Sequence, residues 1–437
     1  MRIDRVSIEN FKCFKAVDIE LGKLTLLTGA NSSGKSSILY SILGPLQSGE
    51  FPFQFSPNGK YVNMGNFQEM SCKHLNENII KIGLRISGAG MEPVSLSTWW
   101  EEDKVRKLPR LARLELDYGF CKLEIQKKRK YTLNYRFYHH KFFEDSLLWL
   151  QKYDPSLIGE SWIALDLRLK ESHRFTFENF NELERLSLER DDRRFYSVIK
   201  SLKLLVNEVD NNINFINSFR LFPERTYYET TKTDLKVGKF GEDYVNQVIL
   251  WETQKAKEYN ELIKVMKNLS LLDDIKSKRL NGGRFEIIVK VTNNSLPVSL
   301  NDVGFGISQF LPIVVADLQL REESTLFVAQ PEIHLHPSVQ AQFGDYMVNR
   351  INQSRENYII ETHSEYLLNR IRLAIVKKEI AREDVKIYFF QNYGEDTQTH
   401  QLEFTTDGQI LNAPEDFFKT YMMDVMNIAV NANANGE

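Results

Sequence analysis

Eight residues near the start of the chain have the types and the spacing that can hold a row of phosphates. They read Gly29-Ala30-Asn31-Ser32-Ser33-Gly34-Lys35-Ser36 and match the pattern G-x-x-x-x-G-K-[ST]. The two glycines permit backbone angles that turn successive N–H groups toward an anion. The Lys35 ammonium can approach the β- and γ-phosphates, and the Ser36 hydroxyl can coordinate Mg²⁺. We therefore predict a nucleotide phosphate site with contacts from Asn31, Ser32, Ser33, Gly34, Lys35, Ser36 and Ser37.

The elements that must position this loop can be read on either side of it. Residues 24–28 are apolar and β-branched, which predicts a buried strand that ends at the loop. Residues 36–46 predict a helix whose N-terminus faces the anion, with Gly44-Pro45 expected to end it. Upstream, residues 2–9 and 17–21 alternate apolar and polar side chains, as half-buried strands do. The strand–loop–helix context separates this motif from a chance Gly/Ser-rich turn.

Composition narrows the class of protein but names no function. A length of 437 residues, with 42% hydrophobic and 26% charged residues, fits a packed chain of one to three domains. No apolar stretch is long enough to cross a bilayer, and the first residues lack the apolar core of a signal peptide. Cys13, Cys72 and Cys121 have no paired or metal-like spacing, so we expect a reduced, cytoplasmic setting without a membrane partner. A net charge of −3 gives no global attraction to nucleic acid, so any polyanion site must be local.

The loop and the residues ahead of it resemble a known family. Phe11-Lys12-Cys13-Phe14 lies between two predicted strands, and this start is similar to that of the ABC-type P-loop ATPases of the OLD, RecF and SMC kind. The resemblance implies ATP as the nucleotide, Mg²⁺ as its metal and an α/β fold. That fold is an ABC-type P-loop NTPase core, a mixed sheet with flanking helices and an N-terminal antiparallel β part, with a large helical and β insertion. We expect residues 1–95 and 285–437 to form the two halves of the core, and residues 96–284 to form the insertion.

Two further motifs of that family can be matched. Gln68 lies where the family has a glutamine that senses the γ-phosphate and binds the metal, although an ordinary loop glutamine is an equal interpretation. Residues 298–312 resemble the signature loop, with Gly304, Gly306 and Ser308 before or within a helix expected to begin near residue 307. A helix N-terminus offers free N–H groups to a phosphate. In the family this loop reaches the nucleotide of a second protomer, which implies at least a head-to-tail dimer.

The strand that should carry the catalytic acids departs from the family pattern. Residues 325–337 resemble an apolar strand followed by two acids, Pro-Glu and His-Leu-His-Pro, but Ala329 and Gln330 occupy the two acidic positions. An alanine has no oxygen for Mg²⁺, and a glutamine can orient a water without accepting its proton. Glu332 remains and is expected to substitute in part. We therefore predict an ATPase with slow turnover.

A histidine follows the next predicted strand. Residues 358–370 read as a buried strand, then Glu361-Thr362-His363-Ser364, then a helix capped by Ser364. The carboxyl end of a parallel strand near the phosphate loop would place His363 beside the γ-phosphate. The resemblance assigns it the role of a switch histidine. The catalytic residues predicted from the sequence are Gln68, Gln330, Glu332 and His363, and the predicted metal ligands are Ser36 and Gln68.

The centre of the chain is less informative. Residues 195–214 and 242–267 have apolar residues at helical spacing, without the heptads of a long coiled coil. Arg220 and Arg225 lie in a block similar to one in bacterial defence ATPases, and a structural ion pair is favoured over a nucleotide contact for them. Lys104–Lys130 holds ten Lys or Arg residues against three acids. This span predicts either a local DNA contact or, as the favoured interpretation, a solvated hairpin face.

The whole pattern most resembles the ATPase subunits of bacterial anti-phage defence systems of the Septu type. That resemblance implies a separate effector protein, a nuclease. The chain beyond His363 lacks the acidic cluster of an OLD-type nuclease domain, which favours cleavage by another protein. We expect a sensor or regulatory scaffold that dimerises head-to-tail around ATP. The alternative is a RecF-like DNA-repair ATPase that acts directly on DNA.

Overall fold

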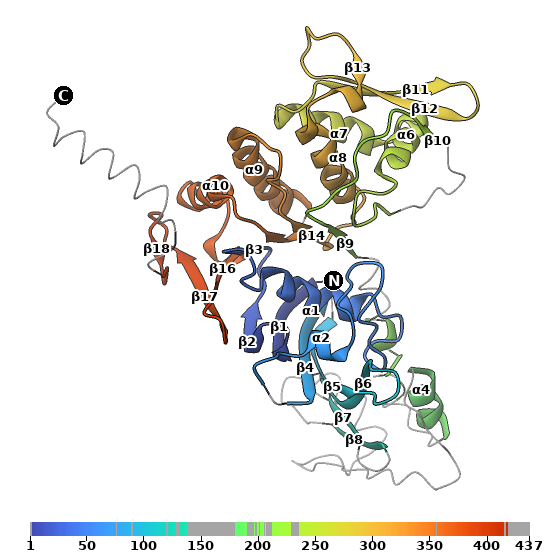
Figure 1. Ribbon diagram of the computed structural model, residues 1–437, viewed down its shortest axis with the longest axis vertical. Coiled ribbons are helices and arrows are strands. Elements are labelled where there is room, and N and C mark those ends of the chain that lie inside the picture. The colour runs from blue at the N-terminus through green and yellow to red at the C-terminus, as the bar shows by residue number, and fades with distance from the viewer. Residues whose placement is uncertain are drawn as a thin grey trace, which may run out of the picture.

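A computed structural model describes most of the chain. The described residues are 2–75, 77–88, 91–118, 121–127, 131–137, 180–189, 196, 199–200, 202–204, 206, 212–228, 236–354, 356–414 and 417. Figure 1 shows a central sheet with a β-rich part at one end of the molecule and a smaller lobe of strands and helices at the other.

The central sheet is built around the strand that precedes the phosphate loop. Its order is β18-β17-β16-β3-β15-β14-β9. The bounds are β3 Leu24–Gly29, β9 Ile213–Ile216, β14 Thr325–Ala329, β15 Asn357–Glu361, β16 Val385–Asn392, β17 Thr397–Phe404 and β18 Ile410–Leu411. The five strands from β16 to β9 are parallel, so their carboxyl ends meet at one edge. Every residue of β3, β14 and β15 is buried, as expected of strands covered on both faces.

Helices cover this sheet. They are α1 Lys35–Leu46, α8 Phe305–Leu318, α9 Pro337–Ser354 and α10 Glu365–Val376, with the 3₁₀ helix η4 Arg382–Asp384 before β16. Ser364 caps α10 as predicted, because its Oγ accepts a hydrogen bond from the Leu367 N–H at 3.0 Å. The prediction that Gly44-Pro45 ends α1 is wrong, because the helix continues to Leu46. Pro45 lies in the last turn, where the loss of one N–H donor disrupts little of the helix.

A second sheet is antiparallel, with the order β2-β1-β4-β5-β6-β7-β8. The bounds are β1 Arg2–Phe11, β2 Phe14–Glu20, β4 Ile79–Gly88, β5 Met91–Glu102, β6 Pro109–Asp117, β7 Cys121–Lys127 and β8 Tyr131–Phe137, with α2 Phe67–Met70 ahead of β4. The predicted N-terminal antiparallel part is confirmed. Strands of the insertion extend this same sheet, since β5 pairs with β4 along its length.

A smaller lobe lies beyond the central sheet, and one further helix packs its Phe180 ring against Phe53. The lobe holds α6 Tyr244–Gln254 and α7 Lys257–Asn268 beside the sheet β10-β12-β11, with β13 pairing β12, and the helix is α4 Phe180–Glu189. The strands are β10 Tyr227–Tyr228, β11 Asp274–Leu280, β12 Arg284–Lys290 and β13 Val298–Ser299, with the 3₁₀ helix η3 Leu300–Asp302 following. The mixed α/β fold of an ABC-type P-loop ATPase is therefore present. No described helix is both long and apolar enough to span a bilayer.

One helical prediction in the centre is corrected. The periodic pattern of residues 195–214 was expected to be helical throughout, but its last two residues begin β9. Strand β9 pairs in parallel with β14 and is fully buried. A short apolar run at the end of a helical pattern cannot be separated from a strand by periodicity alone.

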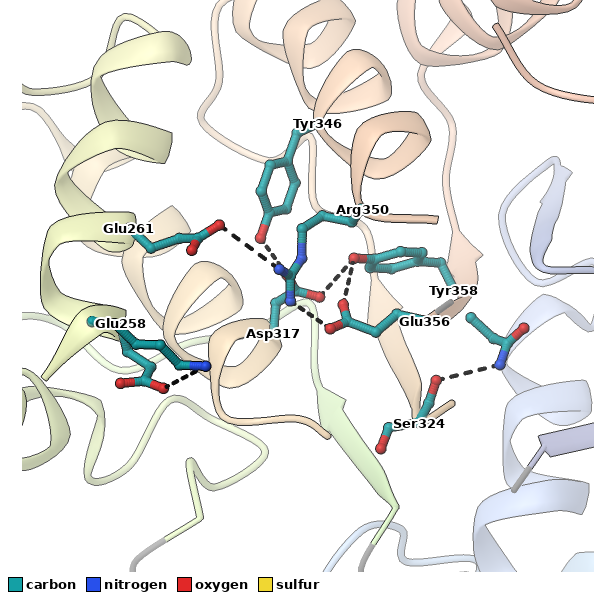
Figure 2. A network of polar contacts seen from close by, with 10 residues as sticks. Glu258, Glu261, Asp317, Ser324, Tyr346, Arg350, Glu356 and Tyr358 are labelled. Carbon is teal, nitrogen blue, oxygen red and sulfur yellow. Dashed lines mark hydrogen bonds and ion pairs between the residues drawn. The ribbon is translucent and has the colours of Figure 1, made fainter. Parts of the chain in front are cut away.

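A buried charged network joins three elements of the core (Figure 2). Asp317 near the end of α8 accepts hydrogen bonds from Arg350 of α9 at 3.0 Å and from the Tyr358 hydroxyl of β15 at 2.7 Å. Arg350 also pairs with Glu356, and the Tyr358 hydroxyl lies 3.1 Å from a Glu356 oxygen. Burial and the nearby charge of Asp317 raise the pKa of Glu356 to about 9. One arginine thus serves two buried acids, and Glu356 holds a proton near neutral pH.

We predict that Glu356→Gln flattens the pH dependence of folding stability. In the unfolded chain this carboxyl group releases its proton near its ordinary pKa of 4.5, whereas the folded chain holds the proton up to about pH 9. Stability is therefore lost as the pH rises through this window, by up to about 1.4 kcal/mol per pH unit from one group. Denaturant unfolding between pH 5 and pH 9 should show a shallower fall for the variant. The exposed control Glu322→Gln should keep the wild-type slope, and an unchanged slope in Glu356→Gln would contradict the assignment.

Candidate functional site

The phosphate loop is held by close packing against the hairpin of β1 and β2. Gly34 precedes α1 with a φ of 99°. A Cβ at this position would lie 2.6 Å from Cys13 Sγ and 2.8 Å from the Phe14 ring. Only glycine fits both the backbone angle and the contact. The residues ahead of the loop therefore shape it directly, and no larger residue can replace Gly34.

The loop lysine is buried in its own loop. Lys35 is 4% exposed, and its Nζ donates hydrogen bonds to the carbonyl oxygens of Gly29 at 3.1 Å and Ala30 at 2.7 Å. Burial lowers the pKa of Lys35, and the negative charges of Glu361 and Glu332 oppose this effect. The ammonium group therefore stays in place at the loop, close to where phosphates would lie.

A cavity of about 540 Å³ opens over the loop, a size typical of ligand sites. All seven residues predicted to contact phosphate line it. The remaining lining comes from five segments of the chain. They are Lys12 and Cys13, then Glu69, Ser71, Lys73 and His74, then Gln330 after β14, then Glu361 at the end of β15, and finally Asn392, Gly394 and Thr397. The buried Ser33 hydroxyl has no hydrogen-bond partner, which leaves a polar atom for a ligand.

A carboxylate that the sequence reasoning missed lies beside the loop. The Ser36 hydroxyl donates a hydrogen bond of 2.8 Å to Oε2 of Glu361, the last residue of β15. Glu361 is 5% exposed, and burial raises its pKa while the Ser36 hydrogen bond and Lys35 lower it. The pattern of residues 358–370 predicts a role for His363 and none for Glu361. The sequence does contain a feature that points to Glu361. It is an acid at the carboxyl end of the strand before His363, and this strand is predicted to lie near the strand of residues 24–28.

The predicted catalytic residues are not all at the cavity. Gln330 lines it, and its backbone N–H donates to the Glu361 carbonyl at 2.7 Å. Glu332 does not line it, because its carboxylate accepts from the Thr362 hydroxyl at 2.9 Å and the His363 N–H at 2.6 Å. His363 is exposed to solvent and also lies outside the lining. Partial desolvation of its ring, followed by the positive charge of Lys35, lowers the pKa of His363.

Gln68 lies in α2 and is exposed, outside the residues that line the cavity. Its neighbour Glu69 lines the cavity instead, with its carboxylate used in the capping box of α2. The Glu69 Oε2 accepts from the Asn66 N–H at 2.8 Å. In this conformation Gln68 is therefore placed apart from Ser36, the other predicted metal ligand.

The predicted signature loop begins a helix elsewhere on the chain's surface. Gly304 caps α8, which begins at Phe305 and so two residues before the predicted start. Gly304, Gly306 and Ser308 do not line the cavity over the loop of the same chain. The Phe305 ring packs edge-on against the His334 ring at 4.9 Å. The start of α8 is thus fixed against the turn that follows β14.

The buried side chain of Arg220 connects α8 with the end of β14. It is 2% exposed and donates to the carbonyl oxygens of Gln309 at 3.2 Å, Ala329 at 3.1 Å and Gln330 at 3.0 Å. Burial lowers its pKa to about 10, and Glu332 opposes this. Arg220 therefore ties α8 to the end of β14 through backbone oxygens. Arg225, by contrast, forms the predicted kind of ion pair, with Asp302 at 2.7 Å.

The basic span is largely neutralised where the structure describes it. Residues 128–130, its densest part, lie outside the described residues. Four basic residues of the span pair with acids, namely Arg110 with Glu101, Lys107 with Glu102, Arg113 with Glu115 and Glu124, and Lys122 with Glu115. Most of these acids lie on neighbouring strands of the same sheet. The described part therefore has the character of a solvated hairpin face.

The oxygen ligands at the cavity fit a metal ion that is bound partly by the protein and partly by a ligand. No cluster of three or more His, Cys, Asp or Glu residues suited to a metal occurs among the described residues. The hydroxyl of Ser36 and the carboxylate of Glu361 are adjacent oxygen ligands. Mg²⁺ is commonly bound by one or two protein oxygens together with substrate phosphates and water. The residues present therefore fit Mg²⁺ bound with a nucleotide.

The comparison with protein families decides the family. A model described as "AAA ATPase domain" matches residues 1–368. This chain belongs to the AAA ATPase domain family. No curated protein matches the sequence. A P-loop ATPase is therefore the assignment that the fold and the family support together.

Solved structures similar to this AAA ATPase domain protein include SMC head domains. The SMC head domain from Thermotoga maritima has 11% identity and a TM-score of 0.40, over 91% of this chain and 98% of that one. The Smc head domain from Pyrococcus furiosus, bound to the C-terminal domain of ScpA, has 12% identity and a TM-score of 0.43, over 98% and 99%. An SmcHead bound to the C-winged helix domain of ScpA has 11% identity and a TM-score of 0.43, over 92% and 98%.

We predict that Gly306→Ala destabilises the protein while Gly304→Ala does not. A Cβ at position 306 would lie 2.7 Å from the carbonyl oxygen of His334, so the helix start or the turn must move. Overpacking of this kind costs about 1–3 kcal/mol. A Cβ at position 304 meets no atom within 4 Å. Thermal unfolding of the pair measures the difference, and equal melting temperatures would contradict the packing described.

Proposed function

We propose that this protein is a nucleotide-gated ATPase that dimerises head-to-tail around ATP. The observation that carries the proposal is the cavity at the phosphate loop. It holds all seven predicted phosphate contacts, while none of Gly304, Gly306 and Ser308 reaches it within one chain. In a head-to-tail dimer the N-terminus of α8 from the partner would close the cavity and donate N–H groups to the γ-phosphate.

The roles of this chain's own residues follow from the geometry. The loop N–H groups and Lys35 would bind the phosphates, and the Ser36 hydroxyl would hold Mg²⁺ against them. Bound Mg²⁺ would neutralise the charge of the β- and γ-phosphates. Gln330 lines the cavity and can orient a water, but an amide cannot accept the water's proton. Glu332 is held by two hydrogen bonds away from the cavity. Slow hydrolysis therefore suits a sensor better than a motor.

An exposed apolar segment supports a contact beside the signature helix. Phe219, Leu221 and Phe222 are 66%, 49% and 65% exposed. The Phe222 ring packs on the Phe305 ring at 4.8 Å, at the start of α8. Large apolar side chains gathered at the surface in this way commonly mark an interface. In the proposed dimer this segment would lie next to the closing nucleotide site.

The wider role rests on the sequence resemblance. We propose that the closed dimer is a regulatory scaffold for a separate effector, a nuclease, in anti-phage defence. ATP binding would close the assembly, and hydrolysis or release would open it. Copurification of the chain with the products of neighbouring genes tests this role, and a nuclease partner retained only with ATP is expected. A partner-free protein that instead binds DNA with strong salt dependence would favour direct action on DNA.

We predict that Lys35→Ala reduces ATP affinity by at least about 100-fold, because a buried ammonium that contacts two phosphates is lost. Isothermal titration calorimetry with ATP and Mg²⁺ measures the change. The surface variant Lys377→Ala, whose side chain is 53% exposed, is the control and should bind as the wild type does. Tight ATP binding by a folded Lys35→Ala protein would remove the phosphate-loop assignment.

We predict that ATP with Mg²⁺ converts the chain from monomer to dimer and that Phe222→Asp weakens the dimer by at least about tenfold. The charge would have to be buried in the contact beside α8. Light scattering with and without ATP measures the mass. Leu296→Asp, at another exposed apolar position of 82% exposure, should leave dimerisation unchanged. A mass that does not respond to ATP would contradict the gating proposal.

A further inference from the structure

The strand that should supply the metal-binding acid has none. Ala329 ends β14, and the following residue is Gln330. In the parallel pairing of β14 with β15, Ala329 is in register with Glu361. Residues side by side on neighbouring strands project to the same face of the sheet. The end of β14 therefore has no carboxylate, whereas β15 has one, that of Glu361, at the position in register.

The position of Glu361 meets the needs of a metal ligand. Its Oε2 lies 2.8 Å from the Ser36 hydroxyl, and both residues line the cavity. Strand β15 is hydrogen-bonded directly to β3, which places its carboxyl end next to the loop. A cation bound between these two oxygens, with the Ser36 O–H turned away from Glu361, would contact both, while the cavity leaves room for phosphate oxygens and water.

The other acids near the cavity are engaged elsewhere. Glu332 accepts from Thr362 and His363 and does not line the cavity. Glu69 lines it, but it is exposed and its Oε2 accepts the N–H of Asn66 in the capping box. Of the acids that line the cavity, only Glu361 contacts a hydroxyl of the phosphate loop.

We propose that Glu361 supplies the carboxylate for the Mg²⁺ of bound MgATP, with Ser36, in place of the acid missing at Ala329. This inference rests on the proposed ATP binding at the phosphate loop. Glu361 turns from its hydrogen bond with Ser36 to the metal, directly or through one water. Ser36 keeps its proton and presents a lone pair. The carboxylate has thus moved by one strand, from β14 to β15, which pairs directly with β3.

The first experiment measures ATP affinity by calorimetry with Mg²⁺ and with EDTA. In the wild type, Mg²⁺ should raise the affinity although position 329 is alanine. In Glu361→Gln the gain from Mg²⁺ should fall by about tenfold or more, the usual range when a metal site loses a carboxylate partner, while affinity in EDTA changes little. The amide can still accept from Ser36, so the fold should survive, which thermal unfolding checks. The control is the exposed Glu322→Gln, which should keep the wild-type response.

The second experiment moves the carboxylate from position 361 to position 329. The double variant Ala329→Glu with Glu361→Ala exchanges the two residues that are in register. It should recover most of the Mg²⁺ dependence that Glu361→Ala alone loses. Mn²⁺ titration followed by electron paramagnetic resonance gives a readout of metal binding in the ATP complex that does not depend on hydrolysis.

The outcomes distinguish the proposed role of Glu361 from the proposed ATP binding at the phosphate loop. A wild type whose ATP affinity is unaffected by Mg²⁺, or a folded Glu361→Gln with an unchanged response, overturns the role of Glu361. ATP binding that is lost in Lys35→Ala would then still support the phosphate-loop site. ATP binding that survives Lys35→Ala overturns the site itself.

Discussion

The hydrogen bond between Ser36 and Glu361 is the interaction on which the rest of the site depends. It joins the first turn of α1 to the end of β15 and so fixes the loop against the neighbouring strand. The loop, in turn, is shaped by the contact of Gly34 with Cys13 and Phe14. Because the end of the loop that enters α1 is held by both contacts, its N–H groups and Lys35 are arranged before any ligand arrives. Preorganisation of this kind lowers the entropic cost of binding.

Strand β15 also links the site to the signature helix. Its residue Tyr358 belongs to the buried network of Asp317, Arg350 and Glu356, and its last residue is Glu361. The network holds one end of α8, and Arg220 holds the middle of α8 to the end of β14. A displacement of α8 by a partner protomer would therefore be carried by rigid, charged contacts to both strands at the site. Such contacts have few alternative arrangements, because each buried charge needs its partners.

Short sequence motifs predicted much of this structure. They did not predict the features that depend on which strands pair and in which register. The phosphate loop, its flanking strand and helix and the cap at Ser364 follow from residue spacing and type, and the core α/β fold follows from the family resemblance. The length of α1 beyond Gly44-Pro45 and the strand β9 within a helical pattern are decided by tertiary packing. The importance of Glu361 could not be read from spacing alone, because it arises from which strands are neighbours and which residues face one another. For the same reason Glu332, although next to the motif, lies apart from the cavity.

The most direct test of this account is a crystal structure of the protein with Mg²⁺ and a non-hydrolysable ATP analogue. The account predicts a metal bound to the β- and γ-phosphates, the Ser36 hydroxyl and an oxygen of Glu361, the last directly or through one water. The signature helix of a second protomer should then lie at the γ-phosphate. A metal that takes its protein carboxylate from Glu332, with Glu361 still bonded to Ser36, would contradict it.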